Sequence, residues 1–216
     1  MRNIFSKLLI LLLIFTSCDS NNFQLKKLLP KKSIETVYGT LGTVQIVPLG
    51  PVSNKILNEV KNSITQFYGR PVEIVQPQKP KGNLRRTPQS RLSADSILKY
   101  YRSDRETIVV TSFDITIYDK IKKADWGIFG WGYFPPGKTC VISCYPGRLG
   151  KGVSEKVLLS RIRKVAIHEV GHNLGLHHCE KDVTCVMHAA NKKATQVDIE
   201  KEMFCESCKN KLLELW

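Results

Sequence analysis

The chain has 216 residues, a formal net charge of +14 and seven cysteines. The length suits one domain with a sizeable core, and 42% hydrophobic with 24% charged residues argues against a wholly disordered chain. The positive charge favours an anionic partner, such as lipid headgroups or nucleic acid, without choosing between them. All five histidines lie between residues 168 and 188, and such clustering calls for a chemical explanation.

The first eighteen residues have the layout of a secretory signal. Arg2 and Lys7 are followed by an unbroken apolar run over residues 8–15, and then by the small residues Thr16 and Ser17. An apolar helix of this length rises about 12 Å, whereas the hydrocarbon core of a bilayer is about 30 Å thick. We therefore expect an export signal rather than a transmembrane anchor.

Cys18 follows directly, and residues 15–18 resemble the lipobox of bacterial lipoproteins, except that Phe15 stands where an aliphatic residue is usual. The resemblance implies a signal peptide over residues 1–17 and acyl chains on Cys18. A polar and basic tether over residues 18–40 would then anchor an exported protein to a membrane of the bacterial cell envelope. The alternative is an ordinary cleaved signal in which Cys18 is incidental.

Apolar periodicity predicts the main elements of the remaining chain. Ser53, Ser93 and Ser154 each precede apolar residues at helical spacing, so we expect each serine to cap a helix, the last ending near Gly175 in a left-handed conformation. Residues 76–91 hold three prolines and five basic side chains and predict a loop. Strands are predicted over residues 43–49, 71–75, 107–117 and 138–145.

Residues 126–134 are aromatic and rich in glycine, and end at Pro135 and Pro136. This composition favours an edge strand, whose main-chain groups remain open to pair with another chain.

The predicted third helix carries His168, Glu169 and His172 in the pattern His-Glu-x-x-His. Histidines four residues apart project from one helix face and can reach one tetrahedral zinc ion, while the glutamate lies beside the metal as a general base. Gly175 permits a sharp turn that brings His178 back as a third nitrogen ligand, which leaves one position for water. The alternative is that these histidines merely line a buried helix.

The extended motif resembles that of the metzincin metallopeptidases, in which a Met-turn follows, here at Met187. Together with the cysteines that follow, the pattern resembles the archaemetzincins over about Ala94 to Cys208. The resemblance implies an α+β metzincin-like zincin domain over residues 41–216. It would have a mixed twisted sheet, an active-site helix and a small zinc-bound C-terminal subdomain. It also implies a second, structural zinc ion on Cys179, Cys185, Cys205 and Cys208. The pattern departs in the segment between Cys179 and Cys185, which has five residues instead of the usual four.

Other interpretations of the cysteines and histidines stay open from the residues alone. An exported protein meets an oxidising compartment, so the four cysteines could form disulfides, and Cys205-x-x-Cys208 could be redox-active. Cys140 and Cys144 are predicted on one strand about 13 Å apart, too far for a disulfide, and we interpret them as buried thiols. His177 and His188 are interpreted as bystanders.

We therefore expect a monomeric zinc metallopeptidase with two Zn²⁺ ions per chain. It would hydrolyse peptide bonds in peptide or protein substrates through a zinc-bound water, with Glu169 as general base and Met187 packed beneath the ligands. The substrate would pair with the predicted edge strand. The alternative function is a non-catalytic zinc-binding surface lipoprotein. Nucleic-acid binding rests only on charge and on the basic loop near Arg85 and Arg86, and export argues against it.

Overall fold

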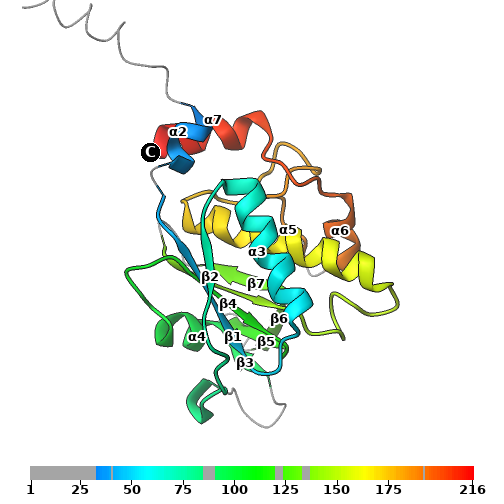
Figure 1. Ribbon diagram of the computed structural model, residues 1–216. Helices are drawn as coiled ribbons and strands as arrows, with labels where there is room; N and C mark the ends of the chain where they lie inside the picture. Colours follow the sequence, from blue (N-terminus) through cyan, green and yellow to red (C-terminus); the bar gives the residue numbers. More distant parts are fainter. Residues whose placement is uncertain (1–32, 40, 85–90, 120–123, 133–136, 192) are drawn as a thin grey trace, which may run out of the picture. The chain divides into compact units, whose positions relative to one another are not determined.

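The computed structural model describes residues 33–39, 41–84, 91–119, 124–132, 137–191 and 193–216 (Figure 1). The predicted signal peptide, Cys18 and most of the predicted tether lie outside these residues. Within the described part of the chain, no helix combines the length and apolar character needed to cross a membrane.

Five strands form a mixed sheet. Its first four strands run parallel to one another, and the last pairs antiparallel at the edge. The order is β2 (Val72–Ile74), β1 (Val44–Leu49), β4 (Thr107–Thr111), β8 (Thr139–Ser143) and β7 (Gly130–Gly132). A second sheet contains β3 (Leu92–Ser93), β5 (Ile115–Asp119) and β6 (Ala124–Ile128). The predicted mixed sheet is confirmed.

Alternating side chains of the central strands divide the interior into two cores, because successive residues of a strand point to opposite faces. The even-numbered residues of β1, β4 and β8, such as Ile46, Ile108 and Ile142, pack in one core with α3 (Asn54–Tyr68) and α5 (Glu155–Asn173). The odd-numbered residues, such as Val109 and Val141, pack in the other core with α4 (Ala94–Tyr100) and the second sheet. Figure 1 shows α3 and α5 lying across the five-stranded sheet.

The three predicted helix caps are confirmed. The side chains of Ser53, Ser93 and Ser154 each accept a hydrogen bond from a backbone N–H in the first turn of the helix that follows. Helix α5 ends at Asn173, and Gly175 has a φ of +99°, the left-handed conformation predicted for it.

Two of the predicted strands each divide into two. Residues 107–117 contain both β4 and β5, because the chain bends at Ser112–Asp114 and enters the second sheet. The bend is fixed by the Thr111 hydroxyl, which donates to Leu49 O and accepts from Phe113 N. Residues 126–134 contain β6, in the second sheet, and β7, at the edge of the first. The edge-strand prediction is confirmed for both strands, because β7 and β6 each lie at one end of the strand order of their own sheet among the described residues.

The folded unit begins at Ile34, before the predicted boundary at residue 41. Residues 34–39 form the short helix α2 (Ile34–Gly39), whose Val37 is buried in the first core. The C-terminal part contains α6 (Ala194–Ile199) and α7 (Glu206–Leu215).

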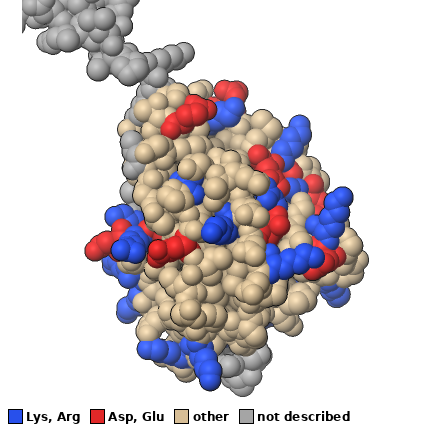
Figure 2. All heavy atoms as spheres, in the orientation of Figure 1, with Lys and Arg blue, Asp and Glu red and all other residues tan. Residues whose placement is uncertain are grey.

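Basic and acidic side chains are interspersed on the face seen in Figure 2. Several form ion pairs between elements, including Lys55 with Glu155 and Arg163 with both Glu59 and Glu202. Such exposed or half-exposed pairs stabilise a fold only slightly.

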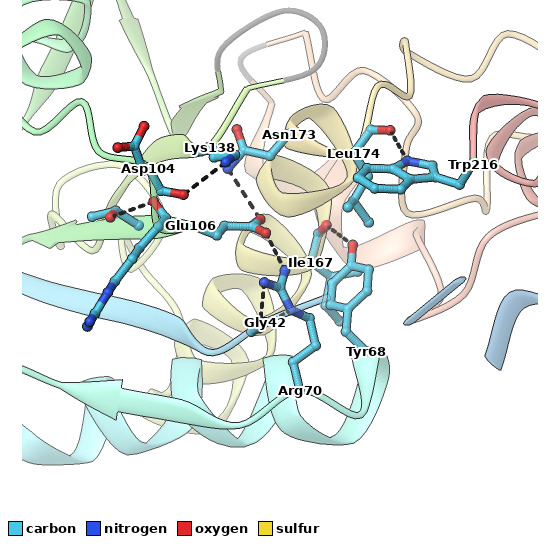
Figure 3. Close-up of polar contacts among 12 residues, drawn as sticks. Gly42, Tyr68, Arg70, Asp104, Glu106, Lys138, Ile167, Asn173, Leu174 and Trp216 are labelled. Carbon is cyan, nitrogen blue, oxygen red and sulfur yellow. Dashed lines mark hydrogen bonds and ion pairs between the residues drawn. The ribbon is translucent and has the colours of Figure 1, made fainter. Parts of the chain in front are cut away.

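A buried ion pair lies near the end of α5 (Figure 3). Arg70, which is 3% exposed, pairs with Glu106, and its guanidinium also donates to Gly42 O at 2.7 and 2.9 Å. Asn173, the last residue of α5, donates weakly to Glu106 at 3.5 Å. Nearby, the Tyr68 hydroxyl donates to Ile167 O at 2.7 Å. These contacts join the ends of β1, β4 and α3 to α5.

Arg70→Met should therefore destabilise the protein by about 3–5 kcal/mol, because it leaves the Glu106 carboxylate buried without its partner. Urea unfolding followed by circular dichroism measures this change. The control is Arg105→Met. The Arg105 side chain is 71% exposed and its guanidinium lies 3.6 Å from the Glu73 carboxylate, so this substitution should lower the free energy of unfolding by less than about 1 kcal/mol. Equal losses in the two variants would contradict the prediction.

Candidate active site

Three histidines converge at the C-terminal end of α5. His168 and His172 lie one turn apart on the helix, and the turn at Gly175 brings His178 beside them. Their ring centroids are 4.6 to 5.3 Å apart, and one nitrogen from each ring lies within 4.8 Å of the others. The three residues therefore form the triangle of nitrogen atoms that the motif predicted.

Backbone carbonyls orient two of these imidazoles. His168 Nδ1 lies 2.7 Å from Val186 O, and His172 Nδ1 lies 2.7 Å from Leu176 O. A carbonyl can only accept, so in both rings Nδ1 carries the proton and Nε2 is left free to bind a metal. Burial lowers the pKa of His172 to about 4 and that of His168 well below its usual value, which keeps both rings neutral.

Glu169 lies beside the histidines and against the edge strand β7. Its carboxylate is 6% exposed, and Oε2 has no hydrogen-bond partner among the described residues. A Cβ atom at Gly130 would come within 2.4 Å of Glu169 Oε1, and one at Gly132 within 3.0 Å of His172 Cβ. The glycines of β7 thus allow the strand to approach the helix, a role that the sequence did not reveal. Burial raises the pKa of Glu169 to about 8.

Met187 lies on the opposite side of α5. It is fully buried, and its sulfur packs so closely on Gly171 that a Cβ there would come within 2.4 Å of Sδ. The backbone joins this turn to the third histidine, since Cys179 N donates to Met187 O at 2.8 Å. His188 Nδ1 donates to Cys179 O at 2.9 Å and is not part of the histidine triangle.

The four predicted cysteine ligands are also brought together. Their sulfur atoms all lie within 4.8 Å of one another, with Cys179 and Cys205 at 3.6 Å and Cys185 and Cys208 at 3.8 Å. Cys205 N donates to Cys185 Sγ at 3.3 Å. Hydrogen bonding, above all with Cys208, lowers the pKa of Cys185. Cys140 and Cys144 lie elsewhere as buried free thiols, as predicted.

The longer segment between Cys179 and Cys185 forms a compact turn. The Asp182 carboxylate accepts from the backbone N–H of Thr184 at 2.8 Å and from its hydroxyl at 2.9 Å, and Val183 points to solvent. The additional residue therefore leaves the cysteine cluster intact.

A cavity of about 380 Å³ lies beside the three histidines. Its lining includes residues of α5 and β7, Ile117 and Ile128 of the second sheet, residues 188–191, and Val197 and Glu200. Glu200, directly after α6, is 5% exposed and had not been singled out from the sequence. No local pattern marked it, because only the fold places it beside the histidines.

Helix α6 is attached to α5 by cations. Arg161 donates from Nε and Nη2 to both carboxylate oxygens of Asp198, at 2.8 and 2.7 Å, and Lys164 Nζ donates to Val197 O at 2.8 Å. These contacts position one wall of the cavity.

Comparison with known proteins identifies the family. The family model described as "Peptidase family M54" matches residues 95–214, more than half of the chain. The chain belongs to peptidase family M54. As a member it is an archaemetzincin-type zinc metallopeptidase.

Curated archaemetzincins show the same relationship. The Pyrococcus abyssi protein is 32% identical over 189 residues, covering 80% of this chain and 95% of the relative. The Haloarcula marismortui protein is 28% identical over 179 residues, covering 79% and 99%. This coverage reaches N-terminal to Ala94, so the resemblance is longer than the sequence predicted.

The crystal structure of archaemetzincin from Archaeoglobus fulgidus, complexed with malonate, superposes with a TM-score of 0.67 at 27% identity. The superposition covers 78% of this chain and 99% of that one. The predicted metzincin-like α+β fold is thereby confirmed.

Gly130→Ala should lower peptidase activity roughly 100-fold, because the added methyl group displaces the Glu169 carboxylate by about an ångström. The measurement is kcat/KM on a fluorogenic peptide mixture, with zinc content checked in parallel. Gly39→Ala, whose added carbon meets no atom within 4 Å, is the control. Full activity in Gly130→Ala would show that the close approach of β7 is not required.

Proposed function

We propose that His168, His172 and His178 hold the catalytic zinc ion of this archaemetzincin, that Glu169 is its general base, and that the four cysteines hold a second, structural zinc ion. The observation that carries the proposal is the buried Glu169 carboxylate, with one oxygen unpartnered, beside three converging imidazoles.

The donor atoms suit zinc in both clusters. Three neutral nitrogens from three histidines leave one ligand position open, which is the pattern of catalytic zinc sites. A tetrahedral ion with Zn–S distances of about 2.3 Å requires sulfur atoms about 3.8 Å apart, close to the 3.6 and 3.8 Å seen here. A disulfide would bring two sulfurs to about 2.05 Å. When bound at the histidines, zinc polarises the substrate carbonyl and lowers the pKa of water.

Glu169 would handle the proton of the reaction. Its free oxygen accepts a proton from the attacking water, and the same carboxyl then returns that proton to the leaving amine. Its burial against Gly130 holds the carboxylate in one place and raises its pKa, which makes it a stronger base toward the attacking water.

The edge strand β7 would bind the substrate backbone. Only one side of β7 is paired, to β8, among the described strands, so a peptide can add to the free side by main-chain hydrogen bonds. Because β7 touches Glu169, a peptide bound there lies next to the base and the histidines.

The cysteine cluster would stabilise the site from below. It joins the segment of His178, the Met-turn and the start of α7, which are remote from one another in the sequence. We further propose that the chain is exported and lipid-anchored through Cys18, a proposal supported by the order of basic, apolar and small residues over 1–18.

Glu169→Gln should reduce kcat/KM by about 10²- to 10⁴-fold, because the amide cannot take up a proton, while zinc content stays at the wild-type level. Peptide hydrolysis and metal analysis of the same preparation measure both quantities. Glu180→Gln is the matched control, because Glu180 is exposed and the substitution removes the same charge nearby. It should leave both kcat/KM and the zinc content unchanged. A fully active Glu169→Gln variant would exclude this mechanism.

Metal analysis also tests the second zinc ion. The wild-type chain should contain two zinc ions, and Cys205→Ser should contain one, since a serine hydroxyl is a poor zinc ligand at neutral pH. Cys144→Ser is the matched control, because its hydroxyl can keep the hydrogen bond to Thr111 O and the metal content should remain two. One zinc ion in both the wild type and Cys205→Ser would contradict the structural site.

A further inference from the structure

The cavity beside the histidines has apolar walls and a single acidic group besides Glu169. Among its described lining residues there is no lysine or arginine, and Glu200 is the second of two acids. Its apolar lining includes Ile117, Ile128, Val165, Ala189, Ala190 and Val197. A side chain that enters this space therefore meets mostly apolar groups, and Glu200 is the one acid besides Glu169 among the described lining residues.

The Glu200 carboxyl has no partner of its own. Oε1 is buried without a hydrogen bond among the described residues, and no ion pair within 4.0 Å joins Glu200 to any of them. The nearby Lys164 ammonium is engaged elsewhere, at 2.8 Å from Val197 O and 3.3 Å from Asp198 O. Burial raises the pKa of Glu200 to about 8, and the charge of Lys164 opposes this shift.

An unpartnered buried carboxyl group is costly, and a ligand that supplies the missing donor recovers that cost. We propose that Glu200 determines specificity in this cavity by binding the ammonium or guanidinium group of a lysine or arginine side chain next to the scissile bond. The inference rests on the proposed peptidase site, since it names the substrate class of that site.

Other side chains fit less well. A second carboxylate beside Glu200 would be unfavourable, because two adjacent acids oppose each other's ionisation, and an apolar side chain would leave the carboxyl group without a partner. A lysine side chain matches both features of the cavity. Its methylene groups can pack against the apolar lining, and its ammonium group can bind the Glu200 carboxyl group.

The test is the binding of two peptide hydroxamates to the zinc-loaded full chain. The two ligands differ only in carrying a lysine or a norleucine side chain beside the hydroxamate, and calorimetry at 0.15 M salt screens the long-range effect of the net charge. The wild type should bind the lysine ligand at least tenfold more tightly. In Glu200→Gln the ratio of the two affinities should fall close to one.

Glu202→Gln is the matched control, because it removes the same charge two residues away and outside the cavity, where Glu202 pairs with Arg163. It should keep the wild-type ratio. Glu200→Asp, which keeps the charge on a shorter side chain, should give an intermediate ratio and guards against a folding defect in Glu200→Gln. Equal or tighter binding of the norleucine ligand by the wild type would overturn the proposal, as would an unchanged preference in Glu200→Gln.

Hydrolysis of a peptide with lysine at the same position is assayed in parallel. A Glu200-dependent preference for the lysine ligand without any hydrolysis would support the specificity residue and contradict the peptidase mechanism. Hydrolysis without that preference would support the mechanism and contradict the role of Glu200. Failure of both ligands to bind the zinc-loaded chain would contradict both.

Discussion

The close contact between β7 and α5 is the constraint on which the site depends. Two glycines in a three-residue strand bring a backbone, rather than a layer of side chains, against Glu169 and His172. A strand edge with open main-chain groups, a buried carboxylate and two histidines therefore lie together without any long loop. Packing between rigid elements gives better-defined geometry than loop placement, as an active site requires.

The same helix is held equally closely from its other side, where Gly171 allows Met187 to pack against the α5 backbone. The Met-turn is in turn bound to the third histidine segment through Cys179 N and to His168 through Val186 O. The cysteine cluster lies directly behind these contacts. A metal ion bound to these cysteines would hold together three segments that are remote in the sequence, and would thereby help to fix the position of His178.

The histidine motif could be predicted because its geometry is local: helical spacing and one left-handed glycine determine where His168, His172 and His178 lie. Serine caps are local for the same reason. The division of residues 107–117 into strands of two sheets could not be predicted, because it depends on the Thr111 contact with Leu49, which is 62 residues away. Glu200 was missed for a similar reason, since its burial depends on how α6 packs against α5.

Helix α5 therefore also anchors α6, besides carrying two of the three clustered histidines. Arg161 and Lys164, three residues apart on one face of the helix, bind the Asp198 carboxylate and the last carbonyls of α6, while His168 and His172 belong to the histidine triangle. The position of Glu200 relative to the histidines is thus determined by one rigid helix. The proposed metal ligands and the proposed selecting acid can therefore vary separately, because the former depend on helical spacing and the latter depends on how α6 is anchored to α5.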